Sequence, residues 1–401
     1  MYIKLNFSNI DYLKTANLRA AGFSAKDTQN IRGLVGNAVA RAPLELIAHV
    51  VKNDMSFTEI LTAKYVMVNP YSARLFDTNP SGTTDFSFSY ADKVDQRNTG
   101  DFRPAVITDN DGRRYPHAGV LTTLSFLNRY PSTATNRNRA RSRIIFQYFL
   151  DTDIEGLASR AGLDLENVIG DYPFEDPQCQ VCHDVMEPMA GLFKNWRDGG
   201  RFGGDNQKWF SGRTPSEMLS PGYTKNEADA LPSGQSGSAL QWLASRVAAD
   251  NRFAVSTVKT MLRGLIGDKA AEDALLVENL KATFVSSEFN LKSLVKEIIS
   301  SEYFRAVNLI VTGNVTSPLD IGVSRLLGPE QLNRKIKAVT GGYTWGFPRK
   351  QKLLNADTFR LLYGGIDSKG VVTRTTNPTP MMASIQDRIA YNTSCNIVAD
   401  D

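Results

Sequence analysis

Apolar residues recur at three- and four-residue steps along most of the chain, which is the spacing of one face of an α-helix. In the N-terminal part this spacing predicts one pair of helices over 43–53 and 56–69 and another pair over 119–130 and 141–153. The C-terminal part has the same spacing, and it predicts helices over 238–250, 252–267, 271–287, 291–307, 329–341, 356–365 and 381–398. The pattern therefore predicts a mainly α fold built from helical bundles.

Two regions depart from the helical spacing. The segments "FSFSYADKVDQ" (86–96) and "FRPAVITD" (102–109) are extended in pattern and predict one small β-hairpin. Residues 197–236 are rich in Gly, Pro, Ser and Asn, which predicts a long loop. We expect three regions: an N-terminal helical region (1–110), a middle region (111–236) and a C-terminal helical bundle (237–401).

Composition and charge narrow the class of protein. The 401 residues are 42% hydrophobic and 22% charged, which is typical of a globular protein. The 46 basic and 42 acidic side chains give a formal net charge of +4, too balanced to favour nucleic acid as a partner. No run of 18 apolar residues predicts a membrane span, and the first residues show no basic and apolar export signal.

The segment "DPQCQVCHDVMEP" (176–188) contains the candidate cofactor-binding residues of the chain. It holds two of the three cysteines and one of the three histidines as C-x-x-C-H, at Cys179, Cys182 and His183. Composition alone predicts such a match about 2 times in 10,000. This spacing is the attachment signature of c-type haem: two thiols one helical turn apart add to the haem vinyl groups, and the adjacent imidazole binds the iron. The middle region is thus the expected haem-binding region, with one covalent haem c.

Three alternatives to haem attachment stay open for this motif. A thioredoxin-like redox pair also uses C-x-x-C, but it expects a βαβ context that the flanks do not predict. A zinc site needs further ligands, and Cys395, His49 and His117 are the remaining cysteine and histidines. A purely structural cluster is the third alternative.

Several segments, taken with the motif, resemble one family. The chain is similar to the planctomycete-type cytochrome c proteins, which are large secreted bacterial proteins made of consecutive domains of unknown function. The resemblance covers nearly the whole chain, over 59–76, 117–150, 179–202, 240–267 and 289–306. It implies a mostly helical, haem-bearing protein that is periplasmic or extracellular, with its export signal upstream of residue 1. Glu187 stands where the family usually has Asp, and Arg141 to Arg143 stand where many relatives have Arg-Gly.

The second iron ligand would decide what the haem can do, because His or Met gives an electron carrier and an open site permits ligand or peroxide chemistry. His117 lies in a segment that resembles the family, and we expect it to be the distal ligand, with a surface or structural histidine as the alternative. Four methionines are further candidates, and core packing is the usual role of such residues: Met189, Met218, Met381 and Met382.

The basic run "NRNRARSR" (136–143) precedes an apolar stretch, which favours the exposed first turns of a helix. Arg141 is a candidate contact for a haem propionate, because a guanidinium matches a carboxylate with two hydrogen bonds. Cys395 is the odd cysteine, and we expect it not to attach haem.

These residues favour a monohaem c-type cytochrome that transfers electrons outside the cytoplasm. Its expected partners are redox proteins or a larger membrane-associated or extracellular complex. No constellation of acid, base and nucleophile is evident, so no catalytic residue is assigned. The alternatives are a haem enzyme with an open iron site, such as a peroxidase-like oxidoreductase, and a structural subunit in which haem stabilises the fold.

Overall fold

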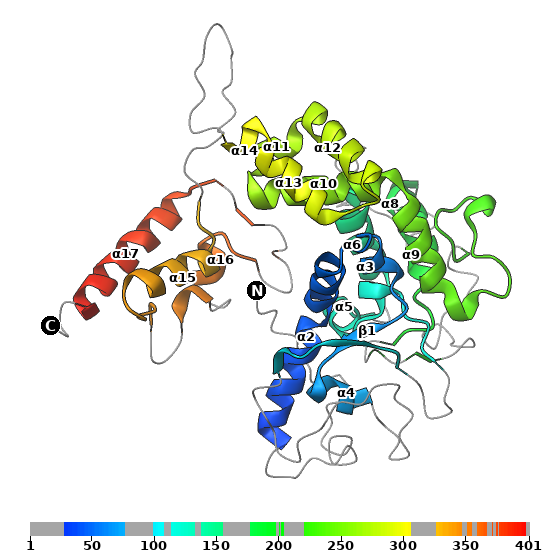
Figure 1. Cartoon of the computed structure of the whole chain (residues 1–401), viewed down its shortest axis with the longest axis horizontal. Coiled ribbons are helices and arrows are strands. Elements are labelled where there is room, and N and C mark those ends of the chain that lie inside the picture. The colour runs from blue at the N-terminus through cyan, green and yellow to red at the C-terminus, as the bar shows by residue number, and fades with distance from the viewer. Residues whose placement is uncertain are drawn as a thin grey trace, which may run out of the picture. The chain divides into compact units, whose positions relative to one another are not determined.

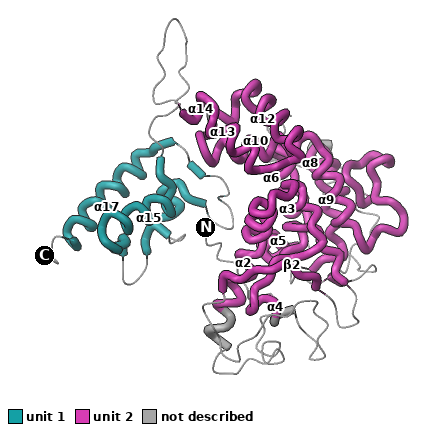
Figure 2. Tube along the Cα trace, viewed as in Figure 1, with its two compact units in different colours: residues 1–4, 323–401 teal, residues 5–322 magenta. Residues whose placement is uncertain are grey.

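The chain folds mainly into α-helices (Figure 1). The computed structural model describes residues 28–76, 99–107, 114–132, 138–154, 177–197, 200, 202–203, 220–305, 326–346, 351–354, 359–366, 371, 374–375 and 377–397. The chain divides into two compact units: unit 2 comprises residues 5–322, and unit 1 comprises residues 1–4 and 323–401 (Figure 2). This division differs from the three expected regions, because the expected boundaries at 110 and 236 both fall inside unit 2.

The first described helix, α2 (Thr28–Lys52), begins well before the predicted helix 43–53 and runs through Pro43. A proline has no N–H, so it leaves the carbonyl four residues earlier, that of Val39, without its helical donor. The Ser125 hydroxyl donates a hydrogen bond to the Val39 carbonyl oxygen. A side chain from a distant segment therefore replaces the missing helical bond, and the helix continues.

Residues Gly33–Lys52 of α2 are long and apolar enough to cross a membrane by length and composition alone. Core helices of soluble proteins meet the same criterion. Leu46 and Val50 are buried in the core of unit 2, while Arg41 and Glu45 form an ion pair on the helix surface. The expected absence of a membrane span stays a prediction.

The predicted helix 56–69 is wrong over its second half. Helix α3 covers only Glu59–Thr62, and Val66–Val68 form strand β1. β1 pairs antiparallel with β2 (Arg103–Ala105), with Val66 opposite Ala105. The three apolar residues of β1 are all buried, and its two valines are β-branched, which favours a buried strand over a helix. The extended segment near 103 is thus confirmed, whereas the expected partner strand, 86–96, lies outside the described residues.

The predicted helix 119–130 divides into a 3₁₀ turn, η4 (Gly119–Thr122), and α5 (Leu124–Arg129). Gly119 has a φ of +45°, and a Cβ there would lie 2.1 Å from the Ile60 carbonyl oxygen. Only glycine permits this close approach, in which the Gly119 N–H donates to the Ala63 carbonyl oxygen at 2.8 Å. Helix α4 (Pro70–Phe76) follows β1 and packs near it.

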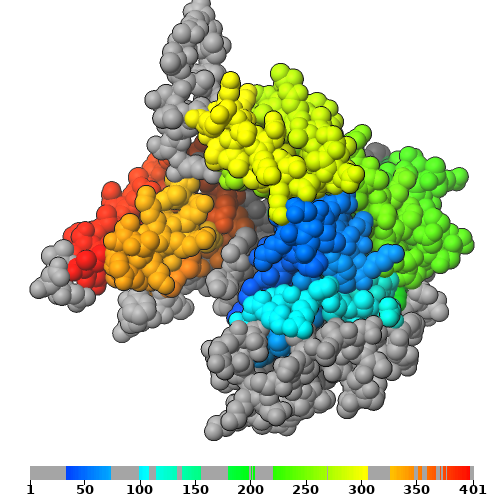
Figure 3. All heavy atoms as spheres, in the orientation of Figure 1, coloured from blue at the N-terminus to red at the C-terminus, as the bar shows by residue number. Residues whose placement is uncertain are grey.

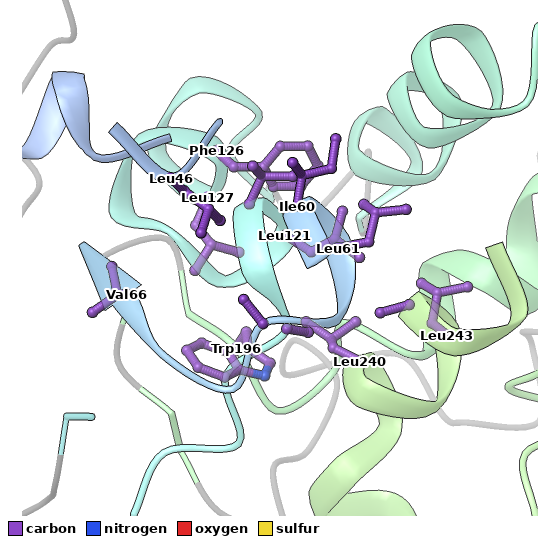
Figure 4. Close-up of a cluster of buried hydrophobic side chains, with 14 of the residues drawn as sticks. Leu46, Ile60, Leu61, Val66, Leu121, Phe126, Leu127, Trp196, Leu240 and Leu243 are labelled. Carbon is purple, nitrogen blue, oxygen red and sulfur yellow. The ribbon is translucent and has the colours of Figure 1, made fainter. Parts of the chain in front are cut away.

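One hydrophobic core joins segments that are far apart in the sequence. Figure 4 shows Leu46 of α2, Leu61 of α3, Leu121 of η4, Trp196 and Leu243 in this cluster. Leu243 belongs to α9 (Ala239–Ala249), and Trp196 follows α8 (Pro177–Gly191). The segment after the C-x-x-C-H motif is therefore anchored in the same core as the N-terminal helices.

Further helices follow α9 along the chain: α10 (Asn251–Leu265), α11 (Asp268–Glu272), α12 (Ala274–Ser286), α13 (Leu291–Ser300) and α14 (Glu302–Arg305). The predicted helical character of this part is thus confirmed, although the predicted helices 271–287 and 291–307 are interrupted at Asp273 and Ser301. Asp250, Asp273 and Asn290 each accept a backbone N–H at the start of a helix, which is a strong N-terminal signal. The surface of α13 meets that of the N-terminal helices (Figure 3), where the Lys292 Nζ lies 2.9 Å from the Asp54 Oδ1.

The segment before α9 contains the short 3₁₀ turns η7 (Glu227–Asp229) and η8 (Ser236–Ser238), so its described part is irregular, as expected. Unit 1 contains α15 (Pro329–Val339), η9 (Lys352–Leu354), α16 (Phe359–Leu362) and α17 (Pro380–Ile397). Its own small core holds Ile336, Trp345, Leu353, Tyr363 and Met382.

Candidate haem-attachment site

Helix α8 carries the whole C-x-x-C-H motif on its first turns. It begins at Pro177, whose fixed φ suits the first helical position. Cys179, Cys182 and His183 are three and four residues apart, so the helix presents them on one side. All three are partly buried. The motif is therefore preordered by local helical structure, with its two thiols about one turn apart.

A buried carboxylate holds the His183 ring. The His183 Nδ1 lies 2.8 Å from the Glu187 Oε1, one helical turn further along α8. The same oxygen accepts a hydrogen bond from the Arg139 Nε of helix α6 (Arg139–Phe149). The Glu187 side chain is fully buried, whereas that of His183 is 18% exposed. A carboxylate that accepts from Nδ1 sets the tautomer in which Nε2 keeps its lone pair.

Helix α6 packs along α8 and fixes this arrangement. The Ser142 hydroxyl donates to the Met186 carbonyl oxygen at 2.9 Å. The Cys182 Sγ lies 3.5 Å from the carbonyl oxygen of Ile154, a few residues after α6. Residue numbers rise along α6 as their partners on α8 fall, so the two helices run antiparallel. Both sides of His183 are thus tied to α6 or to the segment that follows it.

Within the described ranges, no three His, Cys, Asp or Glu side chains gather into a group that could hold a metal ion. Cys395, which a zinc site would have needed, is exposed on α17 in unit 1. The motif cysteines and His183 therefore share a helix, and no further His, Cys, Asp or Glu cluster joins them in the described part of the chain.

His117 lies at the other end of α8. Its ring centroid is 6.4 Å from that of Trp196 and 6.1 Å from that of Tyr115. Trp196 comes after the C-terminal end of the helix, and the helix from His183 to Gly191 is about 12 Å long at 1.5 Å per residue. The contacts of His117 thus place it with the C-terminal end of α8, and the structure does not bring it to His183.

The His117 side chain is only 1% exposed, and burial lowers its pKa to about 4. Its Nε2 accepts the Ile107 backbone N–H at 3.2 Å. Its Nδ1 is buried and finds no hydrogen-bond partner in the described part of the chain. The ring is therefore neutral near pH 7 and held by one backbone contact, so iron ligation would have to use Nδ1 or displace the Ile107 N–H.

The expectation that the basic run forms an exposed helix face is wrong for its central residues. Arg141 is fully buried, and Arg139 is partly buried in its contact with Glu187. The Arg141 guanidinium donates to four acceptors at 2.9–3.1 Å, the carbonyl oxygens of Leu127, Tyr130 and Trp196 and the Asn138 Oδ1. Two of these carbonyls belong to the C-terminal end of α5, which otherwise lacks donors. Arg141 is thus engaged by protein atoms, and its role toward a propionate stays a prediction without support in this geometry.

The methionine candidates have separate outcomes. Met189 is buried in the core of unit 2, and Met382 is buried in the core of unit 1. Met381 is 51% exposed on α17, and Met218 lies outside the described residues. Met189 and Met382 therefore act as core residues.

Sequence reasoning missed the part of Glu187 and Arg139 in the site. Four residues separate His183 from Glu187, and this spacing places two side chains on one face of a helix, so a helix predicted over this segment would have paired them. The approach of Arg139 depends on how α6 packs on α8, and the run of alternating arginines gave no signal for which one turns inward.

No family model, curated protein or solved structure matches the chain.

Proposed function

We propose that the chain is a monohaem c-type cytochrome, in which Cys179 and Cys182 hold the haem and His183 is the proximal iron ligand. The observation that carries the proposal is the His183 Nδ1 contact with the buried Glu187, 2.8 Å long, beside two thiols on the same helix. Ligating histidines generally donate their other ring N–H to a carboxylate or carbonyl. The residues present fit the group, since a carboxylate at Nδ1 directs an iron bond to Nε2.

Covalent attachment needs no further reagent from the protein. Each thiol adds across one vinyl double bond: a C–S bond forms, and the thiol hydrogen goes to the other vinyl carbon, so no atom leaves. The bound haem would supply a one-electron Fe(III)/Fe(II) couple. His183, Glu187 and α8 would hold the ligand nitrogen in a fixed orientation.

The cellular role follows from the class of cofactor and remains part of the proposal. Covalent haem of this type is attached outside the bacterial cytoplasm, so we expect a periplasmic or extracellular protein. Its partners would be redox proteins or a larger membrane-associated or extracellular assembly. One helix-bound haem with no assigned acid–base pair supports electron transfer rather than a defined reaction.

One observation favours a second candidate, a haem enzyme with an open sixth position. The Nε2 of His117, the expected distal ligand, accepts the Ile107 N–H, and its aromatic contacts lie near Trp196. Absorption spectra separate the two candidates. Six-coordinate, low-spin ferric haem supports electron transfer, and high-spin ferric haem supports ligand or peroxide chemistry.

Haem staining after denaturing gel electrophoresis tests the proposal. The chain would be exported in a bacterial host that matures c-type cytochromes. We expect the wild-type band to stain and the Cys179→Ser, Cys182→Ser double variant to remain colourless. Cys395→Ser is the matched control and should stain like the wild type, because Cys395 is exposed in the other unit. A colourless wild-type band at full expression would contradict the proposal.

A further inference from the structure

We infer that Glu187 and Arg139 form a positioning pair that sets the orientation and the electronic character of the His183 imidazole, and with it the reduction potential of the bound haem. The inference rests on the proposed function, since it needs His183 as an iron ligand. It goes further by naming two residues outside the C-x-x-C-H motif as determinants of the potential.

The geometry of Glu187 is unusual for a pairing that only stabilises the fold. An arginine and a carboxylate often pair through two parallel hydrogen bonds that use both oxygens. Here the Arg139 Nε and the His183 Nδ1 meet the same oxygen, Oε1, while the buried Oε2 has no hydrogen-bond partner among the described residues. A buried acceptor without a donor is unfavourable. The carboxylate is thus aligned on the histidine at the expense of its own second oxygen.

Both partners of the carboxylate are fixed by helices. Glu187 lies four residues after His183, so α8 itself sets the reach between the two side chains. Arg139 stands on the first turn of α6, and the Ser142–Met186 hydrogen bond joins α6 to α8 one turn away. The His183 ring therefore has little freedom to turn, and Nε2 is the nitrogen that would bind iron.

The electrostatic effects of the two residues have opposite signs. A carboxylate that accepts from Nδ1 gives the imidazole partial negative character, which stabilises ferric over ferrous iron and lowers the potential. In a fully buried position this effect is screened less than in water. The Arg139 guanidinium shares the same oxygen and withdraws part of that charge. Loss of Glu187 should raise the potential, and loss of Arg139 should lower it.

The experiment compares the reduction potentials of the holoprotein and three variants by spectroelectrochemistry. We expect Glu187→Gln to favour the ferrous form about tenfold, a rise of about 59 mV for one electron. Arg139→Gln should shift the equilibrium about threefold in the opposite direction. Asp184→Asn is the matched control, because Asp184 directly follows His183 but its carboxylate lies 2.5 Å from the Lys225 Nζ. Its shift should stay below twofold.

A spectroscopic readout follows the hydrogen bond itself. In the ferrous, low-spin holoprotein labelled with ¹⁵N-histidine, the three histidines give few ring signals. The Nδ1 proton of His183 should lie far downfield in the wild type and in Asp184→Asn, and should move upfield in Glu187→Gln. That change reports on the contact rather than on net charge.

The outcomes are distinguishable from failure of the proposed function. If the wild type carries no haem, the proposed function fails first, and this inference falls with it. If haem is present but Glu187→Gln shifts the potential no more than Asp184→Asn, the inference is overturned while the function stands. If Glu187→Gln does not mature, Arg139→Gln decides: a lowered potential supports the pair, and an unchanged potential overturns it.

Discussion

The middle of α8 carries His183, whereas the C-terminal end of α8 lies near His117, and the two histidines have opposite surroundings. In the middle of α8, His183 is partly exposed and its Nδ1 meets a buried carboxylate. At the C-terminal end, His117 is buried beside aromatic rings, and burial lowers its pKa to about 4. The first environment favours a ring that donates to an anion and leaves its other nitrogen for a ligand. The second favours a neutral ring locked into the core.

Each of these two regions also buries a charge, and the two charges are satisfied differently. Glu187 is met by two donors on one oxygen, which leaves its second oxygen without a partner in the described part of the chain. Arg141 is met by three carbonyls and one amide oxygen, so its guanidinium is well saturated. The comparison indicates that the contacts at the C-terminal end of α8 serve stability, and those in its middle serve the orientation of His183.

The largest expected effect concerns Arg141. Arg141→Leu should lower the free energy of unfolding by about 3–5 kcal/mol, because four buried acceptors lose a charged donor. Urea denaturation followed by circular dichroism measures the loss. Glu278→Leu, which removes an exposed helical ion pair with Lys281, is the control and should change stability by about 0.5 kcal/mol or less. Equal losses in the two variants would refute the stabilising role of the C-terminal end.

The next effect is the pH dependence that His117 confers. Its pKa is about 4 in the folded chain and 6.5 as an unperturbed side chain. The unfolded chain thus binds a proton first, and stability present above pH 6.5 is lost as the pH falls toward about 4. The full loss is about 3 kcal/mol.

His117→Gln keeps an acceptor for the Ile107 N–H but does not titrate, so its unfolding free energy should be nearly flat between pH 6.5 and 4.5. His49→Gln, at a partly exposed site on α2, is the control and should keep the wild-type slope. An unchanged slope in His117→Gln would show that another group is responsible. The same variant tests His117 as the distal ligand, because loss of that ligand would alter the haem spectrum.

The smallest expected effect lies at the surface beside His183. Lys225 pairs with Asp184, and its side chain is 58% exposed. Lys225→Ala should change the free energy of unfolding by about 0.5 kcal/mol or less, because exposed ion pairs contribute little. Thermal unfolding at low and high salt checks this. A loss of several kcal/mol would mean that the middle of α8 depends on its surface charges for stability.

The fold was predictable where an apolar helix face packs into one core, as in α10 and α12, which begin at the N-caps Asp250 and Asp273. It was not predictable where a distant residue replaces a local signal. Ser125 lets α2 run through Pro43, and the pairing of Val66–Val68 with Arg103–Ala105 turns an expected helix into a strand. Such contacts depend on tertiary packing rather than on spacing.

The candidate site divides in the same way. The C-x-x-C-H motif and the position of Glu187 one turn beyond it can be read from the sequence. The burial of Arg139 and Arg141 could not be read, since alternating arginines before an apolar stretch also describe an exposed helix. The partners that bury them, Glu187 and the carbonyls at the end of α5, come from other segments of the chain.

The central claim is that Cys179 and Cys182 are thioether ligands of one haem. Intact-mass spectrometry of the denatured, exported protein under reducing conditions tests it most directly, because a thioether survives reduction and a disulfide does not. The account predicts a mass equal to the polypeptide plus one haem, and loss of that increment in the Cys179→Ser, Cys182→Ser variant. A wild-type mass equal to the bare polypeptide, or a non-reduced sample with a disulfide at Cys179 or Cys182, would contradict it.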